Sequence, residues 1–191
     1  MQYKNILLTG KRNCGKSTLV NKILDHMGIE YTGYRTLPYY INGYMQGYYL
    51  HGYIDEVYNG YLYSPISIKT SNNKCIRVTE TFDTIGYLIL KNSRKQKGCK
   101  LILLDEIGFL EDDSEKFKLE IKKCLNSEKF CLGVLKDKNS EFLNSIKFRN
   151  DTLIINIEDI SYDDRKIIQD DIENYIKLHR LNGEGLSYER D

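Results

Sequence analysis

Short apolar runs alternate with segments of helical spacing along most of this chain of 191 residues. The runs have the length of buried strands, and the amphipathic segments have the length of helices that cover a sheet. Strands are predicted at residues 3–9, 75–79, 100–106, 130–135 and 152–156. Helices are predicted at residues 19–27, 81–97, 114–125, 140–146 and 162–181. We therefore expect a three-layer α/β fold with a mostly parallel central sheet and helices on both faces.

A different pattern occupies residues 34–50, where two tyrosine-rich runs flank Asn42-Gly43. Asn-Gly is the preferred pair for a two-residue hairpin turn, and tyrosine is a strong strand former. We therefore expect an antiparallel β-hairpin added to the parallel sheet. Pro38 has no backbone N–H to donate, which favours a position at the edge of the sheet for its strand. Residues 51–74 contain glycine, serine and asparagine, and are expected to form loops or short irregular strands.

Tyrosines are concentrated in and after this hairpin, since eleven of the sixteen lie between Tyr31 and Tyr63. Aromatic rings can stack on nucleobases, but the lysines and arginines that normally accompany such a surface are nearly missing from this stretch. The formal net charge of the chain is only +1, and its charges are interspersed. Nucleic acid is therefore not an expected partner, and we interpret the tyrosines as strand-forming residues of a half-buried hairpin.

Five cysteines, at positions 14, 75, 99, 124 and 131, form no C-x-x-C pair. Their odd number and spacing favour reduced thiols in a cytoplasmic protein over a disulfide framework or a zinc site. No stretch approaches the roughly 20 apolar residues of a membrane span, so a membrane is not an expected partner. The first residues lead directly into a predicted strand, and we expect no signal peptide.

The length predicts one domain, which we place at residues 1–181. Residues 182–191 are polar and contain two glycines, and we expect them to form a flexible C-terminal tail.

One stretch between the first predicted strand and helix matches G-x-x-x-x-G-K-[ST], and its residues are Gly10, Lys11, Arg12, Asn13, Cys14, Gly15, Lys16, Ser17 and Thr18. A row of backbone N–H groups at a helix N-terminus binds phosphate, and the position between strand and helix is the context that this motif requires. Gly10 and Gly15 allow the main chain to curve around the phosphates. Lys16 is placed to reach the β- and γ-phosphates, and Ser17 offers a hydroxyl to Mg²⁺. The motif predicts binding of a nucleoside triphosphate with Mg²⁺.

Residues 101–104 are four consecutive apolar residues followed by Asp105 and Glu106. This pattern is typical of a central parallel strand with functional groups at its carboxyl end. An aspartate in this position can hold Mg²⁺, and an adjacent glutamate can orient the attacking water. We therefore predict that Ser17 and Asp105 hold the metal, and that Lys16 and Glu106 are catalytic.

The two motifs together make the chain resemble the THEP1-like nucleoside-triphosphatase family of P-loop proteins. Residues 105–117 are similar to the family pattern D-E-I-G-x-M-E-x-x-S-x-x-F, and residues 33–36 and 47–48 to its paired G-F-x-T and G-F elements. The order and spacing of these elements hold over roughly residues 1–175. The resemblance implies a RecA-like α/β core and Mg²⁺-dependent hydrolysis of ATP and other nucleoside triphosphates, with loose base selectivity.

Three residues depart from the family pattern. Asn13 stands where the family usually has a glycine, and asparagine tolerates a positive φ better than most residues. Phe109 stands where the family commonly has lysine, which removes a possible cation near the phosphates. Val134 stands where the family has threonine, which removes a candidate hydroxyl. The latter two changes leave nucleotide binding intact and put the turnover rate in question.

Three other classes of protein share parts of this pattern. A small GTPase is rejected because no N-K-x-D selects guanine, although residues 83–86 and 105–108 both match the weak pattern D-x-x-G. A nucleotide or small-molecule kinase requires an acceptor pocket and usually an arginine-bearing lid, and the few arginines form no such cluster. A nucleotide-switched adaptor with little hydrolysis also fits the departures at Phe109 and Val134. Both the kinase and the adaptor stay open as alternatives.

The expected reaction is in-line attack of water on the γ-phosphate. Sequence alone aims no arginine at the phosphates, although Arg12 is the nearest along the chain. Because an arginine supplied by a partner or a second subunit accelerates such reactions by orders of magnitude, we expect slow turnover by the isolated protein. This leaves room for a protein partner or self-association.

Overall fold

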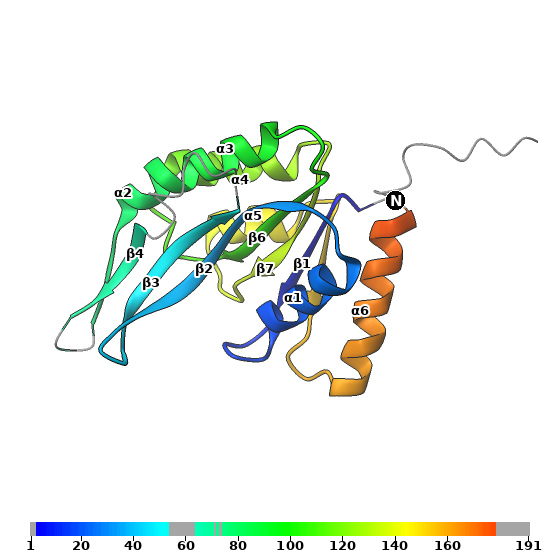
Figure 1. Ribbon diagram of the computed structural model, residues 1–191, viewed down its shortest axis with the longest axis horizontal. Coiled ribbons are helices and arrows are strands. Elements are labelled where there is room, and N and C mark those ends of the chain that lie inside the picture. The colour runs from blue at the N-terminus through cyan, green and yellow to red at the C-terminus, as the bar shows by residue number, and fades with distance from the viewer. Residues whose placement is uncertain (1–2, 54–63, 71, 73, 179–191) are drawn as a thin grey trace, which may run out of the picture.

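Strands and helices alternate along the chain much as the hydrophobic pattern predicts (Figure 1). The computed structural model describes residues 3–53, 64–70, 72 and 74–178. The strands are β1 (Asn5–Thr9), β2 (Tyr31–Ile41), β3 (Tyr44–Tyr53), β4 (Ser64–Lys69), β5 (Cys75–Arg77), β6 (Leu101–Ile107), β7 (Phe130–Leu135) and β8 (Thr152–Asn156). The helices are α1 (Lys16–Met27), α2 (Thr79–Thr81), α3 (Tyr87–Lys95), α4 (Glu115–Leu125), α5 (Glu141–Lys147) and α6 (Tyr162–Ile176), with a π-helical segment at Phe82–Gly86.

All of the described strands belong to one mixed sheet, in the order β5-β4-β3-β2-β6-β7-β1-β8. Strands β2, β6, β7, β1 and β8 are mutually parallel and are called the parallel region below. Strands β3, β4 and β5 continue the sheet through antiparallel pairing and are called the antiparallel extension. The predicted parallel sheet with an added antiparallel hairpin is thereby confirmed.

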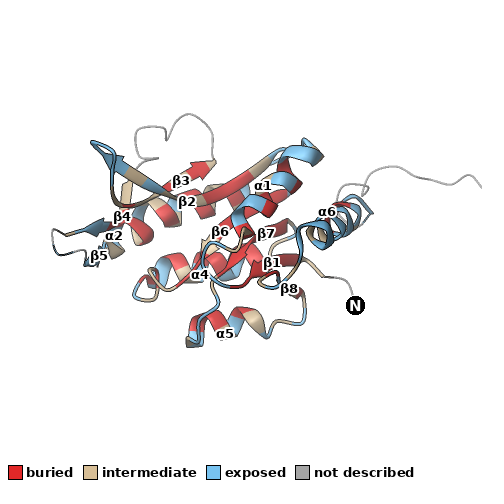
Figure 2. Cartoon of the chain, turned by 90° about the horizontal axis from the view of Figure 1, so that it is seen from below, coloured by how far each residue is buried: buried red, intermediate tan, exposed pale blue. Residues whose placement is uncertain are grey.

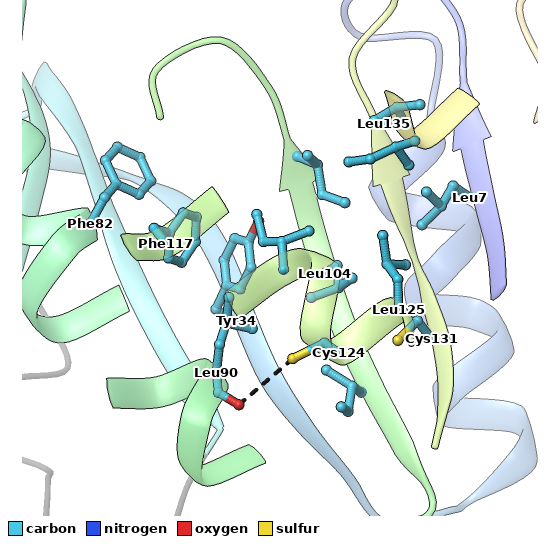
Figure 3. Close-up of a cluster of buried hydrophobic side chains, with 14 of the residues drawn as sticks. Leu7, Tyr34, Phe82, Leu90, Leu104, Phe117, Cys124, Leu125, Cys131 and Leu135 are labelled. Atoms are coloured by element: carbon cyan, nitrogen blue, oxygen red, sulfur yellow. Dashed lines mark hydrogen bonds between the residues drawn. The ribbon is translucent and has the colours of Figure 1, made fainter. Parts of the chain in front are cut away.

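Helices cover both faces of the sheet, so the fold has three layers (Figure 1). On one face, α3, α4 and α5 pack on a cluster that includes Tyr34, Leu104 and Phe117 (Figure 3). On the other face, α1 and α6 pack on a cluster that includes Ile6 and Leu103. Red, buried segments fill the centre of the sheet in Figure 2, and β1, β6 and β7 lie among them. Burial of apolar surface on both faces explains why these strands read as continuous apolar runs.

The hairpin turn between β2 and β3 is at Asn42-Gly43, as predicted. Both residues have positive φ, 51° and 80°, which the two-residue hairpin turn requires. The edge position predicted for the strand of Pro38 is wrong, because β2 lies between β3 and β6. The pairing of β2 with β6 ends at Arg35, however, so Pro38 is paired only with Tyr48 of β3 and needs no second backbone donor.

Other boundaries differ from the predictions where local sequence signals are weak. Strand β3 continues to Tyr53 and β4 forms at Ser64–Lys69, in a region that was predicted as loops or short irregular strands. The helix predicted from Thr81 begins at Thr79 and contains the π-helical segment before α3. The tail predicted at residues 182–191 lies outside the described residues.

Within the described ranges, no helix has the length and hydrophobicity to cross a bilayer.

Candidate active site

The phosphate-loop motif at residues 10–18 connects β1 to α1. Its backbone curves through three residues with positive φ: Gly10 at 133°, Asn13 at 63° and Gly15 at 92°. Asn13 therefore adopts the left-handed conformation that its side chain tolerates. A Cβ at Gly10 would lie 3.1 Å from both Asn156 Oδ1 and Cys14 Sγ, so the loop is packed tightly against the end of β8. The sequence thus folds into a curved main chain at the N-terminus of α1, a kind of position that binds anions through backbone N–H groups.

Lys16 is the first residue of α1, and its side chain folds back across this loop. The residue is 8% exposed, and its ammonium donates to the carbonyl oxygens of Gly10 at 2.9 Å and Lys11 at 2.6 Å. Its Nζ also lies 3.8 Å from Cys14 Sγ. The ammonium of Lys16 is therefore held within the loop by backbone carbonyl acceptors.

The loop meets Asp105, although β1 and β6 are not neighbours in the sheet. The Ser17 hydroxyl donates to Asp105 Oδ1 at 2.8 Å, and the aspartate is 3% exposed. Burial is the largest influence on this carboxyl and raises its pKa, while the hydrogen bonds from Ser17 and Arg35 oppose the shift. Two hard oxygen donors, a hydroxyl and a carboxylate, thus converge at the start of α1.

Arg35 is a site residue to which the sequence analysis gave no role. Its Cα is paired with that of Asp105 across β2 and β6, and its Nε donates to Asp105 Oδ2 at 3.1 Å. Its Nη1 donates to the Tyr53 hydroxyl at 3.3 Å, and its Nη2 is buried without a hydrogen-bond partner among the described residues. The sequence shows that Arg35 is a cation within a predicted strand. It does not show the register between β2 and β6, which places Arg35 beside Asp105.

Glu106 faces a second cation. Lys136 Nζ lies 2.9 Å from Glu106 Oε1, and both side chains are about one-third exposed, at 30% and 32%. The Tyr34 hydroxyl donates to the Glu106 carbonyl oxygen at 3.3 Å from the opposite face. Lys136 directly follows β7, and a charged residue at the carboxyl end of a parallel strand is a signal that could have identified it.

Phe109 is a platform for cations beside this ion pair. The amines of Lys138 and Lys136 lie 4.1 and 4.6 Å from the centre of its ring, and Arg77 Cζ lies 5.4 Å from it. Such positions allow cation–π attraction. Phe109 therefore lies within cation–π distance of cations from β5 and from the segment after β7. Val134 is fully buried in the core on the α1 face.

Glu111 is buried in the segment that follows β6. It is 2% exposed, and its Oε1 accepts a hydrogen bond from the Gly108 N–H at 2.5 Å. Burial raises the pKa of this carboxyl to about 7, although the Gly108 hydrogen bond opposes the shift. The residue fixes the backbone directly after the acidic pair.

The remaining loop residues face outward and contact two other elements. Lys11 forms an ion pair with Glu158, which follows β8, and its N–H donates to the same carboxylate at 3.2 Å. Arg12 Nη2 donates to the Tyr48 hydroxyl of β3 at 2.9 Å. Arg12 therefore points toward the hairpin rather than toward the acidic pair. Thr18 is exposed on the first turn of α1.

A phosphate-binding loop between β1 and α1 and an acidic pair on β6, with β7 inserted between the two strands, define the class of protein. The fold is that of a P-loop nucleoside-triphosphatase. The chain belongs to the NTPase family, whose model matches residues 5–173. The NTPase enzyme class expected from the sequence is thereby confirmed.

Relatives and solved structures agree with this assignment. The chain is similar to nucleoside-triphosphatase THEP1 of Thermotoga maritima, with 28% identity over 183 residues that cover 92% of this chain and 97% of the relative. It is 26% identical to nucleoside-triphosphatase THEP1 of Methanosarcina barkeri over 156 residues, which cover 79% and 87% of the two chains. The THEP1-like resemblance is confirmed.

Two solved structures share the fold. The crystal structure of THEP1 from the hyperthermophile Aquifex aeolicus superposes with a TM-score of 0.66 at 21% identity, covering 88% of this chain and 96% of the other. The solution structure of a human cancer-related nucleoside triphosphatase gives a TM-score of 0.69 at 20% identity, covering 94% and 100%.

Proposed function

We propose that this site hydrolyses nucleoside triphosphates, ATP among them, to the diphosphate and phosphate in a Mg²⁺-dependent reaction. The observation that supports it most strongly is the hydrogen bond between Ser17 of the phosphate loop and Asp105 of the acidic pair. This contact joins the two motifs at one point. Glu106 is the next residue along β6 after Asp105. A curved loop alone would support only anion binding.

The residues present fit a magnesium ion. Mg²⁺ prefers oxygen ligands, and it is usually bound through one or two protein oxygens together with phosphates and water. Ser17 Oγ and Asp105 Oδ1 supply such oxygens, and we assign them as the residues that would hold the ion. When bound, the ion would neutralise charge on the phosphate oxygens.

The remaining chemistry follows from the side chains of this chain. Glu106 aligns a water molecule for in-line attack and accepts its proton as the water oxygen bonds to the γ-phosphorus. The bond from the γ-phosphorus to the bridging oxygen breaks, and its electron pair leaves with the diphosphate. Lys16 stabilises the negative charge that develops on the phosphate oxygens.

We expect slow turnover by the isolated chain. Two of the three guanidinium nitrogens of Arg35 are already bound to protein, and Glu106 is engaged by Lys136. Arg35 and Glu106 can act on substrate or water only alongside, or in exchange for, these contacts within the protein. An arginine delivered by a partner would accelerate the reaction by orders of magnitude.

The test is a pair of measurements on the parent chain and on Glu106→Gln. The parent should release phosphate from ATP and from other nucleoside triphosphates with Mg²⁺ and without any added acceptor. Glu106→Gln should bind a non-hydrolysable ATP analogue with a Kd within about threefold of the parent and lose at least about 100-fold in kcat.

The same measurements separate the alternatives. A kinase would release phosphate only slowly until an acceptor is added, and the γ-phosphate would appear on that acceptor. A nucleotide-switched adaptor would bind the analogue, show almost no turnover in the parent, and be insensitive to Glu106→Gln. Either outcome would refute the proposed hydrolysis.

A further inference from the structure

Arg35 has one guanidinium nitrogen that the protein leaves unused. Its side chain is 13% exposed, its Nε is bound to Asp105, and its Nη1 is bound to Tyr53. Nη2 is inaccessible to solvent and has no hydrogen-bond partner among the described residues. A buried donor without an acceptor costs about 1–3 kcal/mol, and more when the group is charged. Such a cost is expected where the donor serves a ligand.

The position of this guanidinium points to the class of ligand. Asp105 binds the Ser17 hydroxyl through Oδ1 and the Arg35 guanidinium through Oδ2. One carboxylate therefore separates Arg35 from Ser17, the second residue of α1 and part of the phosphate loop. An anion held by that loop lies next to this carboxylate, and its outermost group is the terminal phosphate.

The backbone and an aromatic ring hold the guanidinium in place. Arg35 is the last residue of β2 that is paired with β6, so its Cα is fixed against that of Asp105 in the parallel region. Its Cζ lies 5.7 Å from the centre of the Tyr53 ring, which is in turn 4.9 Å from the ring of Tyr31. A group built on a strand and supported by packing is pre-organised for electrostatic stabilisation.

A purely structural ion pair would leave this arrangement unexplained. A lysine could neutralise Asp105 as a point charge, but its three rotatable N–H donors would have no fixed direction. The planar guanidinium instead fixes the direction of its remaining N–H groups once Nε and Nη1 are bound. The geometry of Arg35 is thus suited to bridge the carboxylate and a second, planar or tetrahedral anion.

We propose that Arg35 Nη2 donates to an oxygen of the terminal phosphate and stabilises the charge that develops there during hydrolysis. The chain thereby carries one arginine of its own for phosphoryl transfer. Because its Nε and Nη1 are bound to Asp105 and Tyr53, we still expect turnover by the isolated chain to be slower than with a second arginine from a partner. This inference rests on the proposed function, because it assigns a catalytic residue to the same reaction. It adds a group that comes from the strand joining the parallel region to the antiparallel extension.

The test compares Arg35→Lys and Arg35→Gln with matched variants of Arg94. Arg94 also pairs with a buried carboxylate, since its guanidinium binds Glu120 at 2.8 Å, but this pair joins α3 and α4. For each variant we would measure Tm, the Kd of a non-hydrolysable ATP analogue, kcat at saturation, and the capture of ADP by aluminium fluoride with Mg²⁺.

Both Arg35 variants should lose about 100-fold or more in kcat while the Kd of the analogue changes less than about fivefold. They should also lose the capture of ADP by aluminium fluoride, which mimics the transferred phosphoryl group. The Arg94 variants should lower Tm and leave kcat and capture at parent values. A merely structural Arg35 would behave like Arg94.

A measurement on the unaltered chain covers variants that fail to fold. The ¹⁵N and ¹H signals of the Arg35 side chain should shift when ADP, aluminium fluoride and Mg²⁺ are added together, and much less with ADP alone. Unchanged signals, or variants that keep parent kcat and capture, would overturn the inference. Failure of the parent to hydrolyse any triphosphate refutes the proposed function instead, and the NMR comparison still decides the contact.

Discussion

The parallel region and the antiparallel extension differ in how deeply their strands are buried. Every residue of β1 and β7 is buried, whereas all three residues of β5 are exposed and most residues of β3 are only partly buried. The parallel region carries the phosphate loop and both acids, so its buried frame holds them rigidly. The extension contributes contacts to the site from its side, such as the Tyr48 and Tyr53 hydroxyls.

Strand β2 joins the parallel region to the antiparallel extension, and its burial changes along its length. Its first residues pair with β6 and are largely buried, and its last residues are largely exposed. Arg35 stands at the point where pairing with β6 ends. The buried frame therefore carries the phosphate loop and the residues proposed to hold the metal, while Arg35, at the boundary between the two parts, places a positive charge beside Asp105.

The largest effect is expected from removing the central cation of the parallel region. Lys16→Ala should lower kcat/KM by on the order of 1,000-fold, because the ammonium that neutralises the phosphates is lost. Steady-state phosphate release measures this loss, and a Tm near that of the parent shows that the loop still folds. Lys22→Ala on an outward position of α1 is the control and should keep parent activity. Unchanged nucleotide affinity in Lys16→Ala would contradict the assignment of the loop.

The next largest effect is expected at the join between the two parts. Gly33 has a φ of 113°, and a Cβ there would lie about 2.0 Å from the Leu103 carbonyl oxygen of β6. Gly33→Ala should therefore destabilise the fold by at least about 3 kcal/mol, through backbone strain and a broken β2–β6 contact. Gly43→Ala is the matched control, since Gly43 also has a positive φ but open space around it. The free energy of unfolding in urea is measured for both variants. A much larger loss for Gly33→Ala than for Gly43→Ala would show that the steric contact with β6, and not the positive φ, causes most of the destabilisation.

A smaller effect concerns the buried carboxyl behind the acidic pair. The pKa of Glu111 is about 7 in the fold and near 4.5 when unfolded, so its stabilising contribution is present below pH 4.5 and is lost as pH rises through 7. Glu111→Gln should raise the free energy of unfolding by about 2–3 kcal/mol at pH 8 and change it little at pH 4.5. Glu128→Gln, at a side chain that is 95% exposed, should show no such pH dependence.

The smallest effect is expected at the ion pair on Glu106. Lys136→Met should raise kcat about tenfold, because the Glu106 carboxylate loses the cation at 2.9 Å that competes with the attacking water for it. Lys138→Met is the matched control, since Lys138 also lies over Phe109 and its amine is 4.1 Å from the ring centre. An equal change of kcat in the two variants would show that the contacts of these lysines with Phe109, and not the contact of Lys136 with Glu106, affect turnover.

Much of the parallel region could be predicted because its signals are local. The loop motif, the apolar run before Asp105 and the Asn42-Gly43 turn each specify their structure within a few residues. The roles of Arg35 and Lys136 could not be predicted in the same way. Arg35 reaches Asp105 only through the register of β2 against β6, and Lys136 reaches Glu106 only because β7 lies beside β6. Register and strand order are properties of the folded sheet.

The cluster of cations around Phe109 has a consequence for how quickly the protein finds its substrate. Although the whole chain is nearly neutral, three cations lie around Phe109, and of these Arg77 is paired with Asp113 and Lys136 with Glu106, whereas Lys138 has no carboxylate partner among the described residues. A polyanion diffusing toward this cluster is attracted over roughly one Debye length, about 8 Å at physiological ionic strength. The association rate of a nucleoside triphosphate should therefore fall as salt is added, although the net charge alone predicts no salt dependence.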